Sequence, residues 1–176
     1  MISKLLKRNF PMKFALKLIA AHALFFCDTA VWAHVALDEP VALAGANYKA
    51  ALRVSHGCQG SPTIGITVRI PPGFQGAKPQ PKPGWVLTID GGEITWTASS
   101  RENALPDAFF DEFVLRGGLP KDAQPLWFKV LQTCETGRND WSQIPTQGVA
   151  TKGLKFPAVL LEIIPSGPAG QGGHQH

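Results

Sequence analysis

The sequence lacks helical periodicity everywhere after residue 33. Windows of about 12 residues in this region either contain Pro or Gly or fail to repeat apolar side chains at the 3.6-residue spacing of a helix. No internal repeat and no second domain are evident. A helical fold is therefore excluded, and an all-β domain is expected.

A long apolar segment is also missing. The apolar run over residues 18–27 is shorter than the roughly 20 residues that a transmembrane helix needs. It follows a group of basic residues and precedes Val31 and Ala33, small residues at the −3 and −1 positions that signal peptidase accepts. We therefore predict a secretory leader over residues 1–33, rather than a retained membrane anchor. Its removal would leave His34 as the first residue of a periplasmic or extracellular protein.

Methionine is scarce, because Met1 and Met12 are the two in the chain and both lie in the predicted leader. Either could start translation, since residues 12–33 already form a complete leader. The mature chain would then contain no thioether, which excludes a methionine-rich site for Cu(I). A nucleophile motif and a pair of acidic residues at a defined spacing are missing as well, so hydrolytic catalysis is not indicated.

Net charge disappears with the leader. The leader takes 5 of the 17 basic and 1 of the 13 acidic residues, which leaves 12 of each in the mature chain. The basic character of the whole sequence is therefore no argument for a nucleic acid or an anionic membrane as partner.

Cysteine is also rare, with three in the chain. Cys27 leaves with the leader, so Cys58 and Cys134 remain. Two cysteines in an exported chain most often form a disulfide, which we expect here. The alternative is that they serve as two soft metal ligands.

Short runs of strand character recur between prolines and glycines. Strands are expected over residues 34–37, 48–54, 64–70, 85–89, 94–98, 109–116, 126–134 and 158–164, with a short one at Trp141. Residues 90–93, Asp-Gly-Gly-Glu, indicate a hairpin turn, whereas the three prolines of residues 78–84 indicate an extended surface loop. Eight or nine such strands predict an antiparallel β-sandwich over residues 34–165, with an up-and-down barrel as the alternative.

The segment 166–176 is rich in glycine and has little to bury, so we expect it to be disordered. Its His174 and His176 could bind a metal ion weakly, and the alternative is a solvated tail.

His34 is the most informative residue. As an N-terminal histidine it would offer an α-amine and an imidazole that can chelate one metal ion. Two nitrogens with one carboxylate oxygen suit a tetragonal Cu(II) ion.

The ordered series of motifs resembles the YcnI-like family of exported copper-binding domains over nearly all of residues 34–164. The series runs His34-Val, Ala44-Gly45, Pro81-Lys-Pro-Gly-Trp85, Ile94-Thr-Trp-Thr-Ala, Phe110-Asp-Glu-Phe113, Gln132-Thr-Cys and Asn139-Asp-Trp141. The resemblance implies an immunoglobulin-like or cupredoxin-like sandwich. It also implies a Cu(II) site of the one-histidine brace type, made of an N-terminal histidine, a carboxylate and a nearby tryptophan.

By this resemblance His34 is the brace and Trp141 the tryptophan. The carboxylate is open, because the chain has Lys49 where family members carry an acidic residue. The candidates are Asp38, Glu39, Asp111 and Glu112. Asp111 and Glu112 are favoured, because they interrupt an apolar strand and need a partner there. An ion pair with Arg53 or Arg69 would explain either residue equally well.

His56 is a further candidate ligand. A disulfide between Cys58 and Cys134 would place it near the strand that carries Trp141, although it could also be an exposed loop histidine. The polar neighbours of Trp141 favour a surface position for its indole, whereas Trp85, Trp96 and Trp127 are expected in the core.

These observations predict a Cu(II)-binding protein of the envelope that acts in copper homeostasis rather than as an enzyme. We expect a monomer or weak dimer that exchanges copper with other trafficking proteins. One alternative is a copper oxidase of the polysaccharide monooxygenase type, against which the single tyrosine, Tyr48, counts. The other alternative is an interaction domain that binds no metal.

Overall fold

The computed structural model describes residues 34–167, which form eleven β-strands and one short 3-10 turn at Arg101–Asn103. The strands are β1 (Ala36–Leu37), β2 (Val41–Leu43), β3 (Asn47–Val54), β4 (Thr63–Arg69), β5 (Gln75–Pro79), β6 (Trp85–Asp90), β7 (Glu93–Ala98), β8 (Asp111–Gly118), β9 (Leu126–Cys134), β10 (Arg138–Trp141) and β11 (Val159–Ile164). They confirm an all-β fold.

The predicted leader, its alternative start at Met12, and the tail histidines His174 and His176 lie outside the described residues. Within residues 34–167 no helix is long and apolar enough to cross a membrane.

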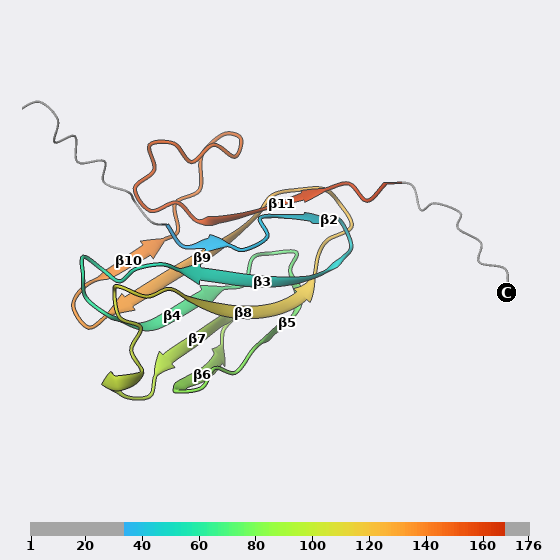
Figure 1. Cartoon of the computed structure of the whole chain (residues 1–176). Helices are drawn as coiled ribbons and strands as arrows, with labels where there is room; N and C mark the ends of the chain where they lie inside the picture. The colour runs from blue at the N-terminus through green and yellow to red at the C-terminus, as the bar shows by residue number, and fades with distance from the viewer. Residues whose placement is uncertain (1–33, 168–176) are drawn as a thin grey trace, which may run out of the picture. The chain divides into compact units, whose positions relative to one another are not determined.

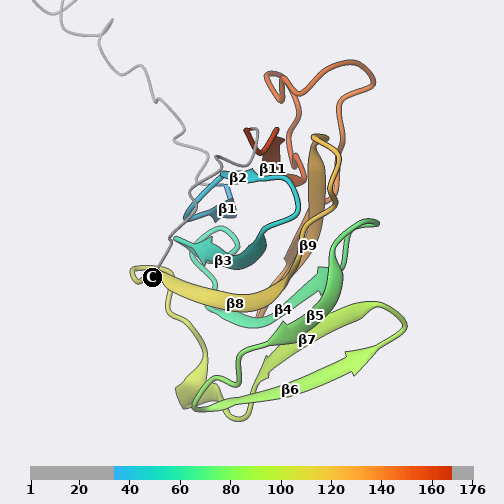
Figure 2. The same cartoon turned by 90° about the vertical axis from the view of Figure 1, so that its right-hand side faces the viewer.

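The strands form two sheets that face each other, which confirms the sandwich (Figure 1). The smaller sheet has the antiparallel order β1-β3-β8-β5. The larger sheet has the order β2-β11-β9-β4-β7-β6, and β10 also pairs with β9. Figure 2 shows the two layers side by side, with β8 and β3 opposite β9 and β4.

Strict alternation of side chains builds the core between the sheets. Every second residue of β9 is buried, and its inward positions are Leu126, Phe128, Val130, Gln132 and Cys134. In β3 the predicted inward set of Tyr48, Ala50, Leu52 and Val54 is confirmed. Apolar burial of this kind is the main contribution to the stability of the sandwich.

Three of the tryptophans test the core prediction. Trp96 is fully buried, and its ring centroid lies 5.7 Å from that of Phe113. Trp85 is half-buried and packs edge-on against the same ring at 5.0 Å. Trp127 occupies an outward position of β9 and is half-buried, so its predicted core position is wrong.

The predicted hairpin is confirmed between β6 and β7. Asp90 pairs with Glu93, and Gly91 and Gly92 form the two-residue turn. Their φ values of 54° and 81° lie in the left-handed region that this tight turn requires and that glycine adopts without strain.

The structure differs from the sequence prediction at three places. β2 was not expected, and β5 extends into the segment predicted as a proline-rich loop. β5 is an edge strand, where a proline such as Pro79 costs no ladder hydrogen bond on its free side. Phe109 and Phe110 precede β8 rather than opening it, because a turn bonds Phe109 N to Pro106 O, and both rings are exposed.

Candidate functional site

His34 lies just before β1 and rests against the side chain of Trp141 at the end of β10. The two ring centroids are 5.5 Å apart, and the ring planes are tilted by 58°. His34 is exposed, whereas the next residue, Val35, turns into the core. The structure therefore brings together the two residues that the resemblance assigns to one site.

Trp141 itself is buried, with an exposed fraction of 2%, so the expected surface position is wrong. Its neighbours Asn139 and Asp140 follow the alternation of β10, which turns the indole inward despite the polar sequence. Phe156 packs edge-on against it at 5.2 Å. The indole thus forms a rigid wall for the ring of His34.

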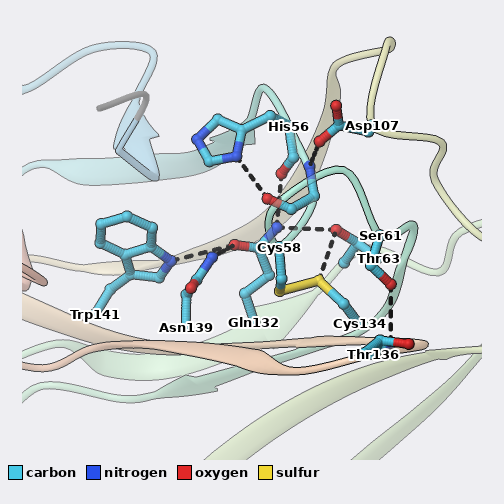
Figure 3. The surroundings of a disulfide bond; sticks show 11 residues. His56, Cys58, Ser61, Thr63, Asp107, Gln132, Cys134, Thr136, Asn139 and Trp141 are labelled. Carbon is cyan, nitrogen blue, oxygen red and sulfur yellow. Dashed lines mark hydrogen bonds between the residues drawn. A yellow bond between two sulfur atoms is a disulfide. The ribbon is translucent and has the colours of Figure 1, made fainter. Parts of the chain in front are cut away.

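Gln132 is the polar centre of this region, as Figure 3 shows. Its Nε2 donates to the backbone oxygen of His56 at 2.7 Å and to Oγ1 of Thr63 at 2.9 Å. Its Oε1 accepts from Nδ2 of Asn139 at 3.1 Å and from Nε1 of Trp141 at 3.4 Å. Gln132 and Thr63 are both buried. Both the nitrogen and the oxygen of the amide are hydrogen-bonded, as a buried polar group requires.

Sequence reasoning missed Gln132, although the sequence contains a signal for it. Gln132 occupies an inward position of β9 among apolar residues. A polar side chain at such a position needs partners in the core, and it therefore marks a buried network.

His56 lies in the loop after β3, where Gln132 bonds its backbone oxygen. Its Nδ1 is 2.6 Å from the backbone oxygen of Gly57. Because a carbonyl only accepts, Nδ1 carries the proton, and the neutral ring then has its lone pair on Nε2. Gln132 therefore connects the backbone of His56 with Trp141. The sequence predicted only that His56 lies near the strand that carries Trp141 when the cysteines pair.

The predicted disulfide between Cys58 and Cys134 is present, with a Cα–Cα distance of 5.9 Å. The loop before it is closely packed: Gly57 N donates to Oδ1 of Asp107 at 2.9 Å. A Cβ at Gly57 would lie 1.9 Å from the backbone oxygen of Ser61, so only glycine fits there. The disulfide and this loop set the position of His56.

The favoured carboxylates have cationic partners instead. Asp111 lies 2.6 Å from Nζ of Lys82, and Glu112 lies 3.8 Å from Nε of Arg53. Asp38 also pairs with Arg53.

Strand order separates Asp111 and Glu112 of β8 from the histidine. β3 lies between β1, which follows His34, and β8, which carries Glu112, so the backbones of β1 and β8 are about 10 Å apart. Lys49 faces outward from β3, four residues before Arg53. Glu39 contributes its backbone oxygen to a 2.5 Å hydrogen bond from the hydroxyl of Tyr48, and burial raises the pKa of that phenol.

Residues 34–167 contain no cluster of three or more His, Cys, Asp or Glu side chains that could hold a metal ion. The arrangement that the structure does provide is a pair of aromatic rings, His34 and Trp141, beside the His56 loop and the Gln132 network. Ligation by Glu112, Asp111 or His56 stays a prediction.

The Gln132 network can be tested by stability. In Gln132→Ala the hydroxyl of Thr63 and the indole N–H of Trp141 lose their buried partners, and we expect the free energy of unfolding to fall by about 3 kcal/mol. Urea unfolding measures this change. Asn139→Ala removes a single bond of the network from a half-buried residue and should cost about 1 kcal/mol. Equal effects of the two variants would contradict a central role of Gln132.

A family model described as "Domain of unknown function (DUF1775)" matches residues 34–93 and 90–163. The chain belongs to this family. DUF1775 is the YcnI-like family, so the resemblance seen in the motifs is confirmed. The match begins at His34, the residue predicted to open the mature chain.

Among solved structures, the DUF1775 chain is similar to an uncharacterized protein from Nocardia farcinica with an immunoglobulin-like fold. The identity is 27% and the TM-score 0.63, over 74% of this chain and 97% of that chain. A type I cohesin from Pseudobacteroides cellulosolvens matches at 8% identity and a TM-score of 0.46, over 81% and 97%. No curated protein matches the chain.

Proposed function

We propose that this DUF1775 protein is exported and binds one Cu(II) ion at His34, as a periplasmic chaperone or homeostasis protein for copper. The observation that carries the proposal is that His34, the first residue of the family domain, has its ring in contact with the indole of Trp141. The Cys58–Cys134 disulfide is compatible with an oxidising compartment outside the cytoplasm.

The donors at this position fit copper. After removal of the leader, His34 would supply its α-amine and one imidazole nitrogen, and nitrogen donors suit Cu(II). Trp141 supplies no lone pair, because an indole nitrogen only donates and this one already faces Gln132. The role proposed for Trp141 is to orient the imidazole and to exclude water from one side of it.

His56 is the third donor that the contacts favour. Its backbone is tied to the same Gln132 amide as Trp141. The carboxylates of Glu112 and Asp111 would have to leave Arg53 and Lys82, respectively, before either could coordinate a metal ion. These nitrogen and oxygen donors favour Cu(II) over Cu(I), and residues 34–176 contain no methionine thioether that would favour Cu(I).

Electron paramagnetic resonance of the mature protein with one equivalent of Cu(II) tests the proposal. The spectrum is expected to show a single tetragonal site with two nitrogen donors from His34 and a third if His56 coordinates. His56→Ala should then lower the nitrogen count by one without loss of the metal. A spectrum of free or many-sited copper in the mature protein would reject the proposal.

The same titration has an expected pH dependence. An α-amine has an ordinary pKa of about 7.7–8.0, and copper must displace its proton. Affinity should therefore be highest above this pKa and fall about ten-fold over the first pH unit below it, because each bound ion then releases one proton from the amine.

A further inference from the structure

Three basic side chains form a row across the outer face of the smaller sheet. Lys49 of β3 is paired with Arg116 of β8, and Arg116 is paired with Lys78 of β5. Directly paired residues point to the same face of a sheet. All three are exposed, whereas Ala50 and Leu115 beside them are buried, so the row faces solvent. Figure 1 shows β3, β8 and β5 as neighbours.

Like charges on directly opposed positions destabilise a sheet. None of the three cations forms an ion pair with a carboxylate within residues 34–167. Further along the same face a cation is paired with an anion, since Arg53 lies opposite Glu112. The row is thus an exception to the pairing of opposite charges on this face. An anion bound above it would relieve the repulsion among the three cations.

A groove accompanies the row. It has a volume of about 680 Å³ and is lined by Lys78 and Arg116, together with the amides Asn47, Gln75 and Gln80.

Its floor is open because β5 and β8 carry glycines there. A Cβ at Gly76 would meet nothing within 4 Å, and one at Gly118 would touch only Gln75 at 4.0 Å. The register of β5 shifts between Gln75 and Lys78, which spreads the strand at this point. Cationic groups and amide donors therefore border a hollow that side chains leave unfilled.

We propose that the Lys49–Arg116–Lys78 row and this groove form an anion-binding site for a ligand that carries two or three phosphate groups. The guanidinium of Arg116 presents paired donors that match a phosphate, and the two lysines on either side add charge at a spacing of about 5 Å. The phosphates could belong to a soluble polyphosphate or to phospholipid headgroups. The site is independent of the copper proposal and lies on different residues.

Binding of inorganic tripolyphosphate, measured by calorimetry at low salt, tests the site. We expect saturable 1:1 binding that weakens as salt is added. Arg116→Gln should lower the affinity about ten-fold, and Lys49→Gln or Lys78→Gln about three-fold each. Lys152→Gln, which removes an exposed lysine in the loop before β11, is the matched control and should leave the affinity unchanged.

Vesicles distinguish the two sources of phosphate. Binding to vesicles of phosphatidylglycerol but not of phosphatidylcholine, with the same loss in Arg116→Gln, would assign the site to headgroups. Binding of tripolyphosphate alone would assign it to a soluble ligand. No binding of either probe, or an equal effect of Lys152→Gln and Arg116→Gln, would overturn the proposal.

Thermal unfolding gives an independent readout. Without ligand, Arg116→Gln should raise Tm by about 1–3 °C, because it removes repulsion from both lysines. At the same concentration, tripolyphosphate should raise the Tm of the unmodified protein by more than that of Arg116→Gln, because the variant binds it more weakly. A lower Tm of the variant without ligand would show that Arg116 stabilises the sheet, which contradicts an unrelieved row.

Discussion

His34→Ala is expected to abolish tight Cu(II) binding by the mature protein. The substitution removes the imidazole and leaves an ordinary N-terminal amine, so the chelate ring is lost. A loss of affinity of at least about 100-fold is expected, since even outer partners of a metal ligand are worth 10- to 100-fold. Competition of the protein with a chromogenic Cu(II) chelator measures the effect.

An N-terminally extended form of the protein tests the α-amine of His34 separately from its imidazole. Retaining five residues, 29–33, in front of His34 keeps the ring but converts its amine into an amide and moves the new amine too far away to chelate with the ring, so binding should fall to the same low level. The double variant His174→Ala, His176→Ala is the control, because the tail could bind copper weakly. Tight 1:1 binding by the extended protein would contradict a site at the N-terminus.

Removing the disulfide is expected to have the largest effect on stability. Cys58 and Cys134 are 76 residues apart, and a cross-link over such a loop restricts the unfolded chain strongly. Replacing both cysteines with serine should lower the free energy of unfolding by about 4 kcal/mol, measured by urea denaturation.

The reduced form of the unmodified protein is the matched control, and its urea midpoint should coincide with that of the double variant. If both keep the midpoint of the oxidised protein, the disulfide contributes nothing to stability. Loss of the bond should also loosen the Gly57 loop, since Cys58 follows it directly. Exchange of the Gly57 amide hydrogen, which is bonded to Asp107, would report this change.

Most of the strands could be predicted from the alternation of apolar and polar residues in the sequence. The strand around Phe128 buries every second residue, the strand around Leu52 does so with Ala51 buried in addition, and the Gly91-Gly92 turn fits one hairpin geometry. In β4 the alternation holds from Ile66 to Val68 and is interrupted by the register shift between Thr63 and Gly65. β2 and β5 escaped prediction because they are short edge strands, where pairing depends on the neighbour rather than on the strand's own residues.

The candidate site was readable in part. The motif series pointed to His34 and Trp141, and the structure places their rings in contact. Burial of Trp141 was not expected, because polar neighbours on a strand say little about the side that faces inward. For Asp111 and Glu112 the sequence left a metal site and an ion pair with Arg53 or Arg69 open. Arg53 of β3 does reach Glu112, whereas Lys82, in the loop between β5 and β6, reaches Asp111.

The sequence by itself determined the all-β class and the membership of the family, because both depend on residue type and local spacing. It favoured a bond between Cys58 and Cys134 because these are the two cysteines that follow the predicted leader. Only the tertiary structure decided that Gln132 joins His56 to Trp141 and that Lys49, Arg116 and Lys78 lie in one row. These relations follow from the register between strands that are distant in the chain. Register is set by the packing of the whole core, so no local pattern reveals it.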